Sequence, residues 1–344
     1  MTLIATPSRT IRLRRGYGGQ VSVGAASAVV TTALIGILTA HAAVQRDSGA
    51  SGERLGPNDP FTVAINTSTI ESAPVLLAHE RAGANGFRII NGGVRNVAAG
   101  SAHAGTNAET QMLAVLPTNT NVRMLMTTAE GLYRIIARKS AGITKLADLR
   151  GKKITTPRNT SAHYHLVKML ASAGVAESEV TIVAVPATEM AAALVDHRAD
   201  AISMWEPEAQ NALEALGNDA VVFQNNGIYR ELFSLYASTD VLGDRQRRAQ
   251  LVDFVRAVLN ATQTVRTMPR SVIPLVAKSI NQPEAKVSTS WRFHAFPAAL
   301  PKEMLDVLTE EERWMAKSQQ REPLSRERLA TFIDTSVLAE ARAK

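Results

Sequence analysis

The chain contains no cysteine in its 344 residues. This absence excludes disulfide bonds, thiolate nucleophiles and zinc sites built on cysteine. It also excludes an N-terminal lipid attached through a cysteine. Aromatic residues are scarce at 5%, with only three tryptophans, which is too few for a wide stacking surface that would bind sugars or single-stranded nucleic acid.

Acidic residues are missing from the N-terminal region, where none precedes Asp47. The same region carries four arginines, so residues 1–42 hold four of the charges behind the formal net charge of +7. The rest of the chain has a formal charge of +3, and its basic residues are interleaved with acidic ones. We therefore expect no nucleic-acid partner, because such a partner requires a basic patch on the folded domain.

The N-terminal segment shows the order of features that marks an export signal. Residues 1–20 are basic, residues 21–40 are uncharged and largely apolar or small, and an A-x-A sequence ends at Ala42. This order is typical of a secretory signal peptide. Residues 1–42 are therefore predicted to be a signal peptide that is cleaved after Ala42.

Two questions about this segment stay open at the level of sequence. An uncleaved membrane anchor is an alternative to the signal peptide, because about twenty residues just span a bilayer. The export route is also open, because Arg14-Arg15 permits twin-arginine export as well as general secretion. Residues 43–60, which are rich in Gly, Ser, Asp and Pro, are predicted to form a flexible leader.

The remaining residues alternate between short apolar strands and amphipathic helices. In the first series, strands are expected at 61–66, 87–91, 95–99 and 122–127, and helices at 71–82 and 108–115. In the second series, strands are expected at 152–156, 180–185, 201–205 and 221–224, and helices at 161–173, 187–197 and 207–216. A strand at 232–238 and helices at 245–266, 300–317 and 325–341 follow. This alternation predicts parallel sheets covered by helices.

The length of the chain and the two series predict two α/β lobes with separate cores. Residues 61–135 and 230–344 are assigned to lobe 1, and residues 136–229 to lobe 2. The chain then crosses between the lobes near 133–140 and 222–237. Two crossings make a hinge, and the cleft between the lobes is the expected place for a ligand. A plain three-layer α/β enzyme is the alternative architecture.

Four loops lie at the carboxyl ends of predicted strands, where open parallel sheets bind ligands. The first loop offers the hydroxyls of Thr67, Ser68 and Thr69 before a helix, where hydroxyls and free N–H groups bind anions. The second loop is a turn with Thr106 and Asn107, also directly before a helix. In both loops, capping of the helix is the alternative role of these side chains.

The third loop connects a strand to a helix and contains Thr156, Arg158, Asn159, Thr160 and Ser161. Its hydroxyls, its guanidinium and the helix N-terminus make it the expected anion clamp. Charge-assisted hydrogen bonds contribute roughly 1.5–3 kcal/mol each, and micromolar affinity needs about 8 kcal/mol. A few such bonds therefore suffice without a metal. A solvent-exposed surface charge is the alternative for Arg158.

The fourth loop contains Trp205 and Glu206. The indole is expected to form a wall of the cleft against an apolar part of the ligand, and the carboxylate is expected to bind an amine. Packing in the core is the alternative for Trp205. A place in the first turn of the next helix is the alternative for Glu206.

Motifs for catalysis or for a metal do not occur in the chain. No G-x-S-x-G, Walker or H-E-x-x-H sequence is present. His163 and His165 are two residues apart and point to different faces of a predicted helix, which is not the spacing of metal ligands. We therefore expect no enzymatic activity, no metal and no cofactor.

The third and fourth loops lie in stretches that resemble a known family. Residues 147–154 (ADLRGKKI) lead into TTPRNTSAHYHLVKMLASAGV, and residues 198–207 contain RADA and SMWEP. Together these motifs resemble the ABC-transporter substrate-binding proteins for sulfonates, taurine, nitrate and thiamine precursors, over about residues 62–240. The resemblance implies a type II periplasmic-binding-protein fold, in which two α/β lobes joined by a two-strand hinge close like jaws. It also implies ligand contacts from all four loops.

By this resemblance, the chain is expected to be a monomeric, periplasmic solute-binding protein of an ABC importer. The expected partners are a small organic anion, sulfonate- or taurine-like, and the permease and ATPase of the importer. The sequence departs from the family pattern at residues 101–104 (SAHA), which leaves the exact ligand open. A sensory ligand-binding module is one alternative function. A pyrimidine-forming enzyme of thiamine biosynthesis is another, but such enzymes depend on a cysteine-rich segment, which this chain lacks.

Overall fold

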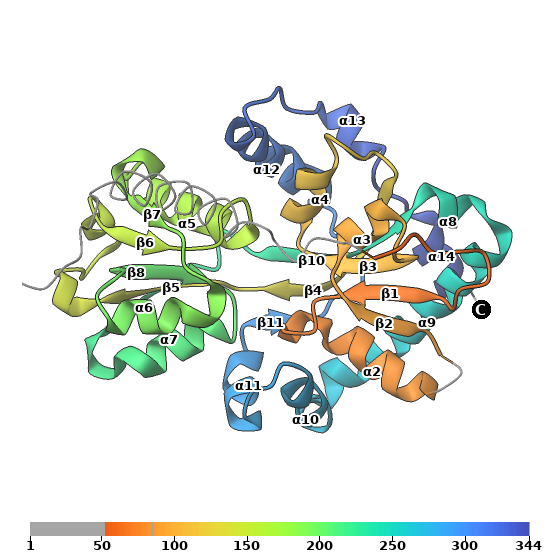
Figure 1. Ribbon diagram of the computed structural model, residues 1–344, viewed down its shortest axis with the longest axis horizontal. Coiled ribbons are helices and arrows are strands. Elements are labelled where there is room, and N and C mark those ends of the chain that lie inside the picture. The colour runs from red at the N-terminus through yellow and green to blue at the C-terminus, as the bar shows by residue number, and fades with distance from the viewer. Residues whose placement is uncertain (1–51, 84–85, 344) are drawn as a thin grey trace, which may run out of the picture. The chain divides into compact units, whose positions relative to one another are not determined.

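The computed structural model describes residues 52–83 and 86–343 (Figure 1). The predicted signal peptide and the leader up to residue 51 lie outside the described residues. The described part of the leader is hydrogen-bonded to the folded chain: the N–H of Leu55 donates to the carbonyl of Gly100 at 2.9 Å, and Arg247 donates to the carbonyl of Pro57 at 2.6 Å. Among the described helices, none combines the length and the apolar character that a membrane span needs.

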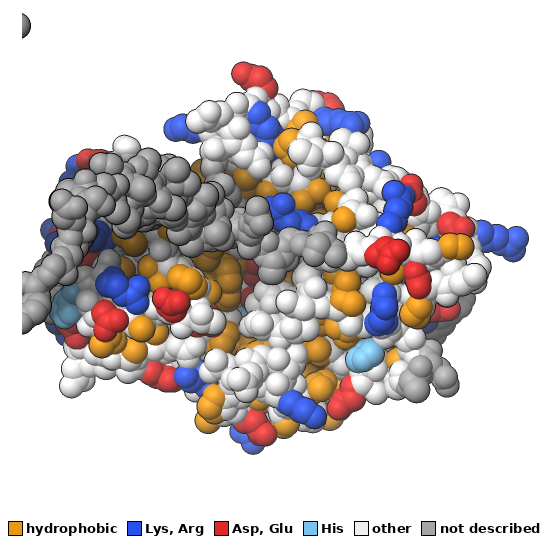
Figure 2. Space-filling model, in the orientation of Figure 1, with side chains coloured by type: hydrophobic (Ala, Val, Ile, Leu, Met, Phe, Trp, Pro, Cys, Tyr) orange, Lys and Arg blue, Asp and Glu red, His pale blue; other side chains and the backbone are white. Residues whose placement is uncertain are grey.

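Charged side chains of both signs are spread over the face of the described residues that Figure 2 shows. On the face shown in Figure 2, lysines and arginines are interspersed with aspartates and glutamates. A surface of this kind does not concentrate positive potential in one place. The expectation that nucleic acid is not a partner stays a prediction.

The first sheet has six strands in the order β11-β4-β10-β3-β1-β2 (Figure 1). Its strands are β1 (Thr62–Ile65), β2 (Arg88–Asn91), β3 (Ala104–Asn107), β4 (Val122–Gly131), β10 (Glu231–Ser238) and β11 (His294–Ala295). β1 pairs in parallel with β2 and β3, whereas β10 pairs antiparallel with β3 and β4. Every residue of β1 is buried, as expected for a strand covered on both faces.

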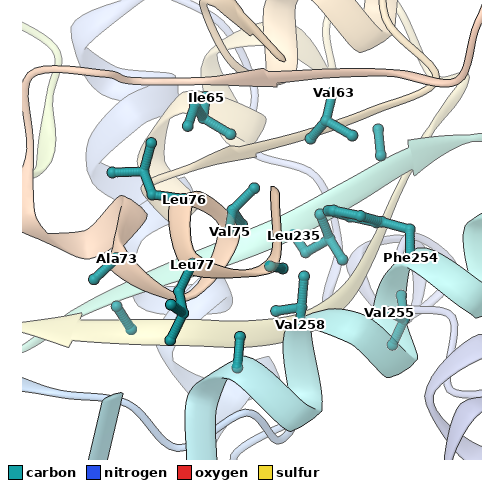
Figure 3. Packing of buried hydrophobic residues seen from close by; sticks show 14 of the residues in the cluster. Val63, Ile65, Ala73, Val75, Leu76, Leu77, Leu235, Phe254, Val255 and Val258 are labelled. Carbon is teal, nitrogen blue, oxygen red and sulfur yellow. The ribbon is translucent and has the colours of Figure 1, made fainter. Parts of the chain in front are cut away.

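Helices cover both faces of this sheet (Figure 1). One face carries α2 (Ala73–Ala82), α9 (Arg245–Thr267), α10 (Pro269–Ser279) and α14 (Ser336–Arg342), and the other carries α3 (Val94–Ala99), α4 (Glu109–Val115), α12 (Met304–Ser318) and α13 (Arg326–Ala330). The short helix α8 (Thr239–Gly243) precedes α9, and α11 (Glu284–Trp291) follows α10. Figure 3 shows Val75 and Leu77 of α2 in one cluster with Ile65 of β1 and Val258 of α9. Burial of each such aliphatic side chain contributes about 1.5–3 kcal/mol.

The second sheet has five strands in the order β7-β6-β8-β5-β9. Its strands are β5 (Arg134–Arg138), β6 (Lys153–Thr155), β7 (Thr181–Val183), β8 (Ala201–Met204) and β9 (Ala220–Phe223). β6 is parallel to β7 and β8, whereas β5 is antiparallel to both of its neighbours. The helix α5 (Ser161–Ser172) lies on one face of this sheet, and α6 (Met190–Val195) and α7 (Glu208–Leu216) lie on the other (Figure 1).

The chain crosses between the two sheets twice. β4 ends in the first sheet at Gly131 and β5 begins in the second sheet at Arg134, so residues 132–133 form the first crossing segment. β9 ends at Phe223 and β10 begins at Glu231, so residues 224–230 form the second crossing segment. Gly131 and Glu231 are partners in the sheet register. The two crossing segments therefore leave the first sheet side by side.

Some elements differ from the sequence expectations. Residues 95–99 belong to the helix α3 and not to a strand, because the Asn96 side chain caps the helix by accepting from the N–H of Gly93 at 3.1 Å. Residues 134–138 form the strand β5, although they lie in the segment where the first crossing is expected. The single helix expected at 325–341 is divided into α13 and α14.

The expected turn before α4 is a strand in the middle of the first sheet. Residues Ala104–Asn107 form β3, whose small and polar composition hides the usual strand signal. Gly105 is required there, since a Cβ atom at this position would lie 2.9 Å from the carbonyl oxygen of Gly93. Because β10 and β5 run against their neighbours, both sheets are mixed and not purely parallel.

Candidate functional site

Polar side chains from both sheets meet in a buried network beside the crossing segments. Its members are Glu71, Glu109, Tyr133, Arg134, Ser161, Glu206, Tyr229, Glu231, Ser290 and His294. We call this set the junction network. Each of the four predicted loops leads into it, because the first two loops are followed by Glu71 and Glu109 and the last two contain Ser161 and Glu206.

Glu71 and His294 form a buried ion pair. Nε2 of His294 lies 3.2 Å from Oε1 of Glu71, and the two side chains are 1% and 2% exposed. Burial alone lowers the pKa of His294, but the charge and hydrogen bond of Glu71 leave that pKa raised. Burial alone raises the pKa of Glu71, but the charge and hydrogen bond of His294 leave that pKa lowered. Both shifts favour the charged forms of the two groups.

Glu231, the first residue of β10, is a second carboxyl group next to this pair. Its Oε1 accepts from the hydroxyl of Ser161 at 3.4 Å, and that hydroxyl is hydrogen-bonded to the hydroxyl of Tyr133 at 2.8 Å. Burial, followed by the charges of Glu71 and Glu109, raises the pKa of Glu231 well above its usual value. Of the two neighbouring carboxyl groups, Glu231 therefore holds the proton and Glu71 holds the charge.

Glu109 connects the second loop to the second crossing segment. It is the first residue of α4 and is fully buried. Oε1 accepts from the hydroxyl of Tyr229 at 2.6 Å, and Oε2 accepts from the N–H of Leu232 at 2.9 Å. Both oxygens are thus engaged by the chain where it returns to the first sheet, and Glu109 holds that return in place.

Glu206 of the fourth loop forms a buried ion pair with Arg134, the first residue of β5. Nη2 of Arg134 lies 2.5 Å from Oε1 of Glu206, and both side chains are at most 3% exposed. Oε2 of Glu206 accepts from the hydroxyl of Ser290 in α11 at 3.2 Å and from the N–H of Gln210 at 3.1 Å. The contact with Ser290 connects the fourth loop, at the end of β8 in the second sheet, to α11, which directly precedes β11 of the first sheet.

The predicted residues of the first loop are occupied within or beside that loop. The hydroxyl of Thr67 donates to Oδ1 of Asn91 at 3.1 Å, and the hydroxyl of Thr69 lies 3.5 Å from the carbonyl of Asn66. Ser68 is exposed. Neither threonine side chain caps a helix N–H, and both hydroxyls are engaged by neighbouring residues at the ends of β1 and β2.

The predicted threonines of the second and third loops are buried without a partner. Thr106 is 0% exposed and Thr156 is 2% exposed, and neither hydroxyl is hydrogen-bonded among the described residues. Asn107 accepts from the N–H of Ala108 at 2.9 Å, at the start of α4. A buried hydroxyl without a partner is costly, so these two threonines are the predicted site residues that most need a ligand atom.

Arg158 and Thr160 of the third loop do not face the junction network. Arg158 is exposed and its guanidinium donates to the carbonyl of Ile182 at 3.2 Å, which corresponds to the surface-charge alternative. The hydroxyl of Thr160 donates to the carbonyl of Pro157 at 2.7 Å. The structure therefore separates these two residues from Ser161 of the same loop.

Asn159 and Trp205 are the remaining predicted residues of the third and fourth loops. The carbonyl of Asn159 accepts from Gln111 of α4 at 3.1 Å, and its Oδ1 accepts from Ser318 of α12 at 2.5 Å. Asn159 thus joins the third loop to two helices that cover the first sheet. Trp205 is half-buried, and its ring lies 6.2 Å from the ring of Tyr133.

Only Ser161 and Glu206 of the junction network were predicted as ligand contacts from the sequence. The other eight members are missing from that prediction: Glu71, Glu109, Tyr133, Arg134, Tyr229, Glu231, Ser290 and His294. Glu231 carried a signal, since it is a charged residue at the start of the apolar strand β10. His294 carried none, because it follows α11 in a two-residue strand far from the other members in sequence. Only the fold brings these residues to the four loops.

The junction network supplies four carboxyl groups and four hydroxyls, with Arg134 and His294 as the buried cations. Such a set accepts hydrogen bonds from ammonium, amide or hydroxyl groups of a ligand. Among the described residues, no group of three or more metal-ligating side chains is arranged to hold a metal ion. The expected absence of a metal and of a cofactor stays a prediction.

Solved structures share this fold. The periplasmic aliphatic sulphonate-binding protein SsuA from Escherichia coli matches with a TM-score of 0.67 at 14% identity, over 81% of this chain and 98% of that chain. The alkanesulfonate-binding protein SsuA from Xanthomonas axonopodis pv. citri, bound to MOPS, matches with a TM-score of 0.62 at 18% identity, over 80% and 98%. A mutant of DSZB in complex with biphenyl-2-sulfinic acid matches with a TM-score of 0.59 at 18% identity, over 82% and 98%.

No curated protein matches the chain. A Candida albicans gene product described as exhibiting the generic periplasmic binding protein structural fold matches with a TM-score of 0.61 at 12% identity, over 80% of this chain and 96% of that chain. Together with the SsuA matches, it confirms the predicted fold class. The model of the family described as NMT1/THI5 like matches residues 91–272, which is more than half of the chain. The chain belongs to the NMT1/THI5-like family.

Proposed function

We propose that the chain is the solute-binding component of an ABC importer and holds a small organic ligand at the junction network. The contact that carries this proposal is the hydrogen bond from Ser161, which starts α5 on the second sheet, to Glu231, which starts β10 in the first. A ligand bound there touches both lobes at once. Under this proposal, residues 61–135 with 230–344 form one lobe, residues 136–229 form the other, and both turn about the crossing segments.

The proposed ligand is a small organic anion of the sulfonate or taurine type. The free N–H groups at the start of α5 and the unpartnered hydroxyls of Thr106 and Thr156 support an anionic head group. The SsuA proteins that share the fold are described as sulfonate-binding. The carboxyl groups of the junction network support an amino group on the same ligand, since ammonium pairs with carboxylate. A taurine-like compound carries both groups.

Calorimetry with three matched compounds tests this ligand class on the purified chain. Ethanesulfonate carries only the anion, ethylammonium carries only the cation, and taurine carries both. We expect saturable binding of taurine and weaker binding of ethanesulfonate. Equal affinity for taurine and ethylammonium would show that the anionic group does not contribute to binding. No binding of any of the three compounds would show that the ligand is not a small sulfonate of this type.

We further propose that the chain works as a monomer in the periplasm, with the permease and ATPase of the importer as partners. The family and the fold of the SsuA proteins support this location and these partners. N-terminal sequencing of protein from the periplasmic fraction tests export and should begin at residue 43. A protein that stays in the membrane fraction with residues 1–42 attached would instead indicate an anchor, and gel filtration reports the oligomeric state.

We propose a binding role without catalysis. One structure with this fold is described as the desulfurization enzyme DSZB, with a TM-score of 0.58 at 17% identity. The SsuA proteins that share the fold are described as binding proteins, which supports a binding role. Oε2 of Glu71 and Oε2 of Glu231 are buried without a hydrogen-bond partner among the described residues and are therefore acceptors for a ligand. Incubation of the protein with biphenyl-2-sulfinic acid should leave this compound unchanged, and its loss over time would speak for an enzyme.

A further inference from the structure

A cavity of about 320 Å³ lies between α5, the second crossing segment and α12. Its lining residues include Tyr164 and Lys168 of α5, Tyr229 and Arg230 beside β10, and Val307 and Glu311 of α12. None of the twelve residues that the sequence predicted as ligand contacts lines it. The volume lies at the lower end of the range for small-molecule sites, roughly 300–1,000 Å³.

Glu311 is the polar group of this cavity that lacks a partner. Its side chain is 0% exposed, and neither carboxyl oxygen has a hydrogen-bond donor among the described residues. The carboxyl group of Glu109 lies nearby, and a protonated Glu311 can donate one hydrogen bond to it, but Glu109 has no hydrogen to donate to Glu311. Both oxygens of Glu109 are already engaged, by Tyr229 and by the N–H of Leu232. Glu311 is thus a buried carboxyl group whose acceptors are unused.

The lysine and the arginine that line the cavity are paired with carboxylates other than Glu311. Nζ of Lys168 lies 2.5 Å from Oε1 of Glu310. The guanidinium of Arg230 lies 3.2 Å from Glu130 and 3.3 Å from Glu303. No lysine or arginine of the described chain is paired with Glu311. The described residues therefore supply no positive charge that would pair with an ionised Glu311.

The remaining walls fit an organic cation better than a bare ion. Tyr164 and Tyr229 meet edge to face, with ring centroids 5.4 Å apart, and both rings border the cavity. Aromatic faces attract cations. Ile228 and Val307 add apolar surface. The cavity therefore combines a carboxyl anchor, two tyrosine rings and apolar side chains.

We propose that this cavity is a second binding site, which adjoins the junction network at Tyr229, and that it takes a small organic cation with an ammonium group on Glu311. The helix α5 covers the second sheet and α12 covers the first. A cation bound between them therefore touches both lobes beside the second crossing segment. Its occupancy therefore stabilises the arrangement of the lobes described here. This site does not depend on the identity of the ligand at the junction network.

Binding of the cation should release a proton. Burial, followed by the charge of Glu109, raises the pKa of Glu311 well above its usual value, so the empty site holds a proton that an ammonium group displaces. Other titratable or charged groups also face Glu311 and influence the pH at which it loses its proton. They are Glu109 of α4, Glu231 and Tyr236 of β10, Tyr164 and Lys168 of α5, Tyr229 and Arg230 of the second crossing segment, and Glu303 and Glu310 beside Glu311. Affinity should therefore rise with pH.

Calorimetry of the full chain with benzylammonium chloride tests the proposal, with benzyl alcohol and benzoate as matched neutral and anionic probes. We expect saturable binding of benzylammonium and at least about tenfold weaker binding of the other two. The binding heat should differ between phosphate and Tris buffers, because a released proton is taken up by the buffer.

Two variants place the probe in the cavity. Glu311→Gln keeps the shape and removes the charge, and should weaken benzylammonium binding more than about tenfold. Glu322→Gln is the matched control, since Glu322 is exposed and does not line the cavity, and should change the affinity less than about threefold. Val307→Phe fills the cavity from a half-exposed position and should abolish binding even if Glu311→Gln does not fold. The proposal is overturned if benzylammonium does not bind, if benzyl alcohol binds equally well, or if both Glu311→Gln and Val307→Phe bind like the wild type.

Discussion

Gly131 and Glu231 face each other across β4 and β10 at the point where the chain leaves the first sheet. A Cβ atom at Gly131 would lie 2.8 Å from Oε2 of Glu231 and 3.2 Å from Oε1 of Glu71. The absence of a side chain at this position is what allows two carboxyl groups to sit next to each other. It also places them at the start of the crossing segments, about which the lobes are proposed to turn.

Gly131→Ala should destabilise the protein through this close contact. A methyl group in a well-packed buried site costs about 1–3 kcal/mol, and here it also presses on two carboxyl groups that have hydrogen-bond partners. Urea unfolding gives the change in the free energy of unfolding. Gly243→Ala is the matched control, because no heavy atom lies within 4 Å of its added Cβ atom. Equal effects of the two substitutions would show that the contact at Gly131 is relieved without cost.

Glu231→Gln should flatten the dependence of stability on pH. Above the ordinary pKa of 4.5, the unfolded chain has lost the proton of Glu231 while the folded protein still holds it, so the free energy of unfolding falls as the pH rises toward the raised folded-state pKa. Glutamine removes this titration and keeps the shape. The variant should be at least as stable as the wild type at alkaline pH.

Melting temperatures measured from pH 4.5 upward check this prediction. Exposed Glu53 provides the control, and Glu53→Gln should show the slope of the wild type. If Glu231→Gln shifts the whole curve without changing its slope, Glu231 is not the group that titrates.

His294→Gln and Glu71→Gln should each destabilise the protein by about 3–5 kcal/mol, because either change leaves a buried charge without its partner. The double variant should lower the free energy of unfolding by less than the sum of the two single losses. The contribution of His294 is present below its ordinary pKa of 6.5 and is lost as the pH rises through the raised value. That of Glu71 is present above 4.5 and is lost as the pH falls through the lowered value.

A double-mutant cycle measured by urea unfolding between pH 4.5 and pH 6.5 gives the coupling where both contributions are present. The exposed pair Arg256 and Asp253 supplies a reference cycle with a coupling of about 0–1 kcal/mol. Additive effects at Glu71 and His294 would mean that the two side chains do not interact.

Ser161→Ala and Arg158→Ala should separate the two halves of the expected anion clamp. Ser161 is 2% exposed and hydrogen-bonded within the junction network, so its loss should weaken taurine binding more than about tenfold. Arg158 is exposed and bonded to the carbonyl of Ile182, so its loss should change the affinity less than about twofold. Calorimetry measures both. A larger effect at Arg158 would mean that its guanidinium leaves Ile182 and reaches the ligand.

Periodicity and turn chemistry were enough to predict most elements of the fold. The helix expected at 161–173 is α5 (Ser161–Ser172), and the strand expected at 61–66 contains β1 (Thr62–Ile65). The prediction failed where a helix or strand is built from residue types that are not typical of it. Residues 104–107 form a strand from small and polar residues because Gly105 lies against the backbone of its neighbours.

The candidate site was predictable only in part. The rule that ligands bind at strand ends selected the loops of Ser161 and Glu206, both of which are buried in the junction network. The same rule gave no means to separate Arg158, which points away, from Ser161 three residues later. The partners that decide the electrostatics, such as His294, come from elements that the rule does not address.

The order of residues by itself determined the α/β alternation, the four candidate loops and the exclusion of thiol chemistry, because these depend on local pattern and composition. Only the tertiary structure decided which carboxyl groups share a buried space. Glu71 and His294 are 223 residues apart in the chain and 3.2 Å apart in the fold. The charge of a group, its proton affinity and its need for a ligand follow from its burial and from such distances. Burial and distance cannot be read from a residue's position in the sequence.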